Sequence, residues 1–141
     1  MSFQQTELEY LIRLQRIIGI GSSKSVTILE SFGGVAHLFS CTKEQWKQSG
    51  LFTESELSKR EKADADYAKQ IIKQCQENGI SIVGYYDERY PERLRNIPAP
   101  PLVLYIKGAL PKVDQEPLFC IVGPRKISDL VERPPIRWPN V

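Results

Sequence analysis

The chain has 141 residues, of which 41% are hydrophobic and 26% are charged, and its formal net charge is +2. This composition is typical of one soluble domain or two small ones, and it excludes disordered and fibrous proteins. The charge is too small to indicate nucleic-acid binding through bulk electrostatics, so any such binding must come from local geometry. The first residues lack the pattern of a secretory leader, and no stretch approaches the roughly 18 apolar residues of a membrane span. We therefore expect a cytoplasmic protein without a membrane partner.

The first two helices are predicted on either side of a glycine-containing turn. A capping box at residues 6–9 precedes apolar residues at helical spacing, so a helix is expected to begin there and to end at Gly19. Ser22 or Ser23 can cap a second helix, which should end at Gly33.

More helical segments follow up to residue 78. Apolar residues in the segment 35–39 predict one short turn, and capping boxes at residues 42–45 and 53–56 predict two short helices. A longer helix with apolar residues between positions 67 and 75 should stop before Gly79. The first 78 residues therefore predict an all-helical domain.

The hydrophobic period changes after Gly79, and strands are predicted at residues 80–85, 102–107 and 118–122. Pro91 suits the first position of a short helix between the first two strands. The third strand is continuously apolar, which is typical of a parallel sheet that helices cover on both faces. Prolines follow from residue 129 onward and leave little room for the helix expected after such a strand.

The turn between the first two helices is the first candidate site. Two glycines around Ile20 allow a tight hairpin whose backbone N–H groups, with the positive start of the second helix, can face a phosphate. This is the pattern of a helix-hairpin-helix, which binds the nucleic-acid backbone without reading bases. The candidate contacts are Gly19, Gly21, Ser22, Ser23 and Lys24. The alternative is that the glycines only let two core helices turn, with Ile20 filling the space beneath them.

The turn after the third predicted strand is the second candidate site. Glycine there permits close approach to a phosphate, an arginine can hold two of its oxygens, and lysine and serine can add contacts. The candidate contacts are Gly123, Arg125, Lys126 and Ser128. The single glycine argues against a dinucleotide-binding fingerprint, and the alternative is a surface turn with two solvated cations.

Three motifs in a fixed order closely resemble the DNA processing protein A family (DprA, also called Smf), bacterial proteins of natural transformation. They are Tyr90-Pro91-x-x-Leu94, the Pro100-Pro101 pair before an apolar strand that ends Lys107-Gly108, and Ile121-Val122-Gly123-x-Arg125-Lys126-x-Ser128. The helical first half also resembles the sterile-alpha-motif-like domain of that family, so the resemblance covers residues 1 to about 128.

The resemblance implies a protein that binds incoming single-stranded DNA and helps to load the RecA recombinase, with no catalysis of its own and no cofactor. The turn from Gly123 to Ser128 corresponds to the family's phosphate-contacting turn. Two features depart from the family: Pro124 removes one backbone N–H from this turn, and the aromatic-glycine step and long α/β domain of relatives are absent after Asp129. We therefore expect a truncated form with weakened activity. Dimerisation and RecA contact belong to the later domain in the family, so neither is assumed here.

The predicted fold class is α+β or partial α/β, with a helical, sterile-alpha-motif-like domain before the first strands of a Rossmann-like domain. The expected boundaries are 1–78 for the helical domain, 79–128 for the incomplete Rossmann-like domain and 129–141 for a divergent tail. Two other functions stay open: a protein-interaction or regulatory module without DNA binding, and an enzyme of nucleotide chemistry. The enzyme is disfavoured because no nucleophile with its base is visible. Cys41, Cys75 and Cys120 lack the spacing of a metal site.

Overall fold

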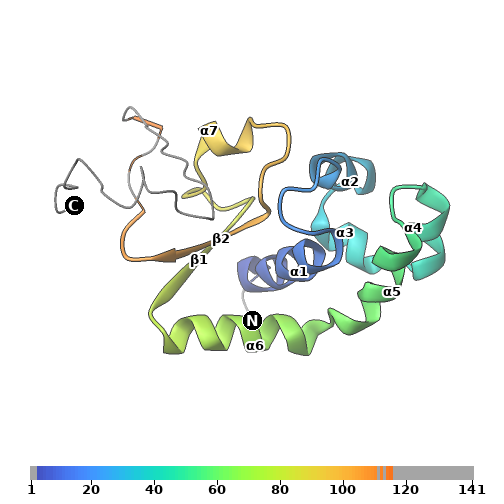
Figure 1. Cartoon of the computed structure of the whole chain (residues 1–141), viewed down its shortest axis with the longest axis horizontal. Coiled ribbons are helices and arrows are strands. Elements are labelled where there is room, and N and C mark those ends of the chain that lie inside the picture. The colour runs from blue at the N-terminus through green and yellow to red at the C-terminus, as the bar shows by residue number, and fades with distance from the viewer. Residues whose placement is uncertain (1–2, 111, 113, 116–141) are drawn as a thin grey trace, which may run out of the picture.

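The computed structural model describes residues 3–110, 112 and 114–115, and in this part of the chain it contains seven helices and two strands (Figure 1). Their order is α1 (Phe3–Ile18), α2 (Ser25–Phe32), α3 (Val35–Ser40), α4 (Lys43–Ser49), α5 (Glu54–Lys62), α6 (Ala65–Glu77), β1 (Ile80–Gly84), α7 (Glu92–Arg95) and β2 (Val103–Lys107). This mixture is compatible with the predicted α+β class. None of the described helices has both the length and the apolar character that a membrane crossing requires.

The capping boxes before α4 and α5 are confirmed in full. The Oγ1 atoms of Thr42 and Thr53 each accept a hydrogen bond from the backbone N–H three residues later, both at 3.2 Å. The side chains of Gln45 and Glu56 accept bonds from the two threonine N–H groups at 2.8 Å. These reciprocal bonds satisfy N–H groups that a helix start would otherwise leave without partners.

Two predicted helix starts are wrong. α1 begins at Phe3, so the sequence of a capping box at residues 6–9 lies inside the helix. Glutamine is a good helix former and no breaker precedes Thr6, so the helix extends toward the N-terminus. α2 begins at Ser25 with Lys24 as its N-cap, and no side chain caps it. Ser22 and Ser23 lie in the preceding turn instead, because the hairpin uses that part of the chain to reverse direction.

The two strands are antiparallel, with Ile80 opposite Lys107 and Gly84 opposite Val103. The expected parallel arrangement is therefore wrong for this pair, and the third predicted strand at 118–122 lies outside the described residues. A parallel pair needs a connection that crosses the sheet, usually a full helix. Here the connection holds only the four-residue α7 and a proline-rich stretch, so it returns at the same end of the sheet.

Pro91 is the N-cap of α7 and not its first helical residue, so the helix begins one residue later than predicted. The tyrosine before it is a buried anchor. The hydroxyl of Tyr90 donates to the carbonyl of Pro101 at 2.7 Å, and Arg95 donates to the carbonyl of Tyr85 at 2.7 Å. The guanidinium of Arg95 also lies 5.2 Å from the ring centroid of Tyr90. In the described region, the tyrosine-proline motif therefore holds the connection between the strands in place.

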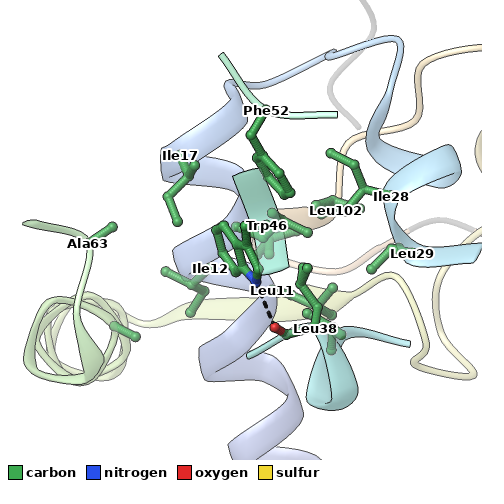
Figure 2. Close-up of a cluster of buried hydrophobic side chains, with 14 of the residues drawn as sticks. Leu11, Ile12, Ile17, Ile28, Leu29, Leu38, Trp46, Phe52, Ala63 and Leu102 are labelled. Atoms are coloured by element: carbon green, nitrogen blue, oxygen red, sulfur yellow. Dashed lines mark hydrogen bonds between the residues drawn. The ribbon is translucent and has the colours of Figure 1, made fainter. Parts of the chain in front are cut away.

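α1 lies at the centre of the described structure, with α6 alongside it and the strands nearby (Figure 1). The hydrophobic core around it contains Trp46, which is fully buried and donates from Nε1 to the carbonyl of Leu38 at 2.8 Å (Figure 2). The indole ring stacks on Phe52 with 4.5 Å between ring centroids. The guanidinium of Arg60 lies 4.3 Å from the indole centroid. One aromatic side chain thus joins α3, α4 and the segment before α5.

A buried glutamine joins the helices to the sheet. Oε1 of Gln15, in α1, accepts hydrogen bonds from the N–H groups of Leu102 and Val103 at 2.9 and 3.1 Å. Gly84 allows β1 to approach the same helix, since a Cβ there would lie 3.0 Å from a methyl carbon of Leu11. Leu102 and Val103 belong to the same hydrophobic cluster as the helical core. The predicted domain boundaries stay predictions, but residues on both sides of position 79 share this core.

Candidate nucleic-acid interface

The hairpin between α1 and α2 contains all of the first set of predicted contacts. Gly19 and Gly21 have φ angles of 89° and 74°, a backbone region that favours glycine. Ile20 between them is 79% exposed, so the alternative in which it fills the space beneath the turn is wrong. Ile17 and Ile28, on the two flanking helices, are buried in the hydrophobic core. The turn therefore presents its tip to solvent.

The start of α2 carries donors that no side chain caps. The N-cap Lys24 makes no capping hydrogen bond with its side chain, so the first-turn N–H groups receive none from it. The helix dipole adds partial positive charge at this end. Oγ of Ser25, the first helical residue, is buried and has no hydrogen-bond partner among the described residues. These features suit an anion, but they do not by themselves identify one.

Lys24 forms an ion pair with Glu56 at the start of α5. The side chain of Lys24 is 29% exposed and that of Glu56 only 11%. The same carboxylate oxygen accepts the bond from the N–H of Thr53 that completes the capping box. The ammonium group of Lys24, which was predicted to contact phosphate, is therefore paired with the carboxylate of Glu56. A phosphate would have to share this ammonium group with Glu56 or replace Glu56 as its partner.

The pKa of Glu56 lies below its ordinary value of 4.5. Burial alone would raise this pKa, but the hydrogen bonds from Lys24 and Thr53 outweigh burial. Because the pKa is lower in the folded chain, ionised Glu56 stabilises the fold above about pH 4.5. This contribution is lost as the pH falls through the folded pKa.

We expect the variant Glu56→Gln to lose the part of the pH dependence of the unfolding free energy that comes from ionisation of Glu56. Glutamine also closes a capping box, so the helix start is kept while the charge is lost. Urea unfolding of both proteins between neutral pH and about pH 3 measures the effect. The stability difference between them should be largest near neutral pH and should shrink in acid. Parallel pH curves would contradict this role for Glu56.

The second set of predicted contacts, Gly123, Arg125, Lys126 and Ser128, lies outside the described residues. The structure therefore groups the hairpin residues 19–24 and leaves the position of the other turn undescribed. Both sets stay predictions as DNA contacts. Within the described part of the chain, no cluster of three or more histidine, cysteine, aspartate or glutamate side chains could hold a metal ion.

Two cavities lie on opposite faces of the sheet. One, of about 410 Å³, adjoins Ser81 and Ile106, which pair across the strands. Asp114 borders it and accepts hydrogen bonds from the N–H groups of Glu92 and Arg93 at 3.0 and 2.9 Å, which lower the pKa of its carboxyl. The other, of about 560 Å³, adjoins Tyr105 and the hairpin.

Sequence reasoning missed Tyr105 as a candidate functional residue. It lies in β2, where alternation places its side chain on the opposite face to that of Ile106. The alternation of side chains along the strand was the signal in the sequence that could have identified Tyr105. However, the strand pattern alone does not show that this face meets a hairpin and a cavity.

The family model described as DNA recombination-mediator protein A matches residues 81–134. The match supports the assignment of this segment to the DNA recombination-mediator protein A family. It is the family that the three motifs predicted, and the match extends from β1 through both described strands to the predicted phosphate turn. The match points to DNA processing in recombination. The helical part before Ser81 lies outside it, so the sterile-alpha-motif-like assignment stays a prediction. No curated protein and no solved structure matches the chain.

Proposed function

We propose that this DNA recombination-mediator protein A relative binds single-stranded DNA during recombination and natural transformation. The observation that carries the proposal is the family match, which includes the turn with Gly123, Arg125 and Lys126. The chemistry of these residues suits a phosphate chain, since arginine can hold two phosphate oxygens at once and lysine adds a point charge. The role requires no catalytic step. Transfer of the bound strand to the RecA recombinase is the further part of the proposal.

The hairpin at residues 19–24 would supplement this turn. Exposed glycines and an uncapped helix start offer backbone donors to a phosphate without reading bases. Such contacts predict binding that is independent of base sequence and weakens as salt rises. They also predict modest affinity, because the ion pair with Glu56 occupies Lys24.

We expect Arg125→Ala to weaken binding of a fluorescein-labelled oligothymidine several-fold at low salt. Loss of one phosphate contact should also make the salt dependence shallower, by about 0.7 in the slope of log K against log salt. Fluorescence anisotropy over a salt series measures both quantities. Lys43→Ala is the matched control, because it also removes one positive charge but lies on α4, where Lys43 pairs with Glu61 at 3.4 Å. Absence of binding by the unmodified chain would contradict the function and favour a protein-interaction module. Equal losses of DNA affinity in the two variants would contradict the assignment of Arg125 as a phosphate contact.

A further inference from the structure

A groove of about 560 Å³ lies between α1, α6 and β2, directly beside the hairpin. Gly19 and the exposed Ile20 form its border on the hairpin side. Tyr67 from α6 and Tyr105 from β2 contribute aromatic rings to its lining. The groove therefore joins the predicted phosphate-binding turn to an aromatic surface, although the two are far apart in the sequence.

Tyr105 presents the more accessible ring, with 45% of the residue exposed. Its side chain lies on the same face of the sheet as that of its cross-strand partner Ile82. Burial, then the nearby Cys75 and Tyr67, raise the pKa of Tyr105 to about 12. The hydroxyl is therefore neutral at physiological pH and adds no negative charge to the groove.

The charges around the groove favour an anionic occupant. Among the residues that the structure describes, Arg16 is the one charged residue in the lining, and no carboxylate lines the groove. A polar contact is available from the exposed side chain of Gln74, which also lines it. Grooves that bind single-stranded nucleic acid combine cations along the backbone with aromatic rings on which bases stack.

We propose that this groove is a base-stacking site for single-stranded DNA, in which a base lies on the ring of Tyr105 while adjacent phosphates face Arg16 and the hairpin at residues 19–24. The inference rests on the proposed function. It adds a second DNA-binding site, which is formed by α1, the hairpin, α6 and β2. A volume of about 560 Å³ is within the usual range for pockets that hold a small organic group.

The test compares Tyr105→Leu with Tyr86→Leu in the full chain. Leucine keeps an apolar side chain but removes the stacking ring, and Tyr86 is a matched control because it is 42% exposed and does not line the groove. The probes are a fluorescein-labelled oligothymidine and an abasic oligonucleotide of the same length. We expect Tyr105→Leu to weaken oligothymidine binding about tenfold, with little effect on the abasic probe. Tyr105→Phe should restore binding, and the salt slope should not change, since no phosphate contact is lost.

The outcomes separate the groove from the function. If the unmodified chain does not bind oligothymidine at low salt, the proposed function fails and the groove assignment fails with it. If it binds and the two leucine variants behave alike, the groove assignment is overturned while the function stands. Equal losses on the thymidine and abasic probes would also overturn it, because stacking requires a base. A change in sedimentation for Tyr105→Leu with unaltered DNA binding would assign the groove to a second copy of the chain instead.

Discussion

Replacing Trp46 with alanine is expected to lower the free energy of unfolding by about 3–5 kcal/mol. The indole is fully buried, so its removal leaves a large cavity between α1, α3 and α4. It also removes the stacking partner of Phe52 and one of the two hydrogen bonds that the carbonyl of Leu38 accepts, the other coming from the N–H of Cys41 at 3.2 Å. Urea unfolding followed by far-ultraviolet circular dichroism measures the loss.

Trp46→Phe is the graded control for this prediction. It keeps an aromatic ring against Phe52 but has no N–H, so we expect a smaller loss, on the order of 1–3 kcal/mol. Small domains have only about 5–15 kcal/mol of stability, so the phenylalanine variant gives a measurable value even if the alanine variant is largely unfolded. A loss below about 1 kcal/mol for Trp46→Ala would show that this side chain is not the centre of the helical core.

Replacing Gln15 with leucine is expected to cost about 2–4 kcal/mol, because two buried N–H groups, those of Leu102 and Val103, lose their acceptor. Leucine is similar in size, so the cost arises from unsatisfied polar groups and not from a cavity. Amide hydrogen exchange gives a local readout. The amides of Leu102 and Val103 should exchange faster relative to the rest of the fold.

Gln74→Leu is the matched control, since it makes the same substitution at an exposed position of α6. It should change stability by less than about 0.5 kcal/mol. Unchanged exchange at Leu102 and Val103 in the Gln15 variant would contradict the role of Gln15 as the link between helices and sheet.

Short-range signals in the sequence predicted much of the helical half. The boxes that begin with Thr42 and Thr53 lie next to the helices they cap, so four adjacent residues contain the whole interaction. The end of α1 before Gly19 is local in the same way. The start of α1 was misplaced because a sequence that can cap a helix does not prevent the helix from extending past it. The family was also visible in the order of its motifs, which the match to residues 81–134 confirms.

The candidate site depended on contacts between residues that are far apart in the chain. The pairing of Lys24 with Glu56 and the bond from the N–H of Val103 in β2 to Gln15 join different elements, and no periodicity in the sequence indicates either. The exposure of Ile20 and the place of Tyr105 beside the hairpin were likewise decided by the packing of α1, α6 and β2. The sequence by itself indicated the family of the segment 81–134 and most of the helices, because those signals are local. The surroundings of each charge and ring were set only by the tertiary structure, because they depend on which distant elements pack together.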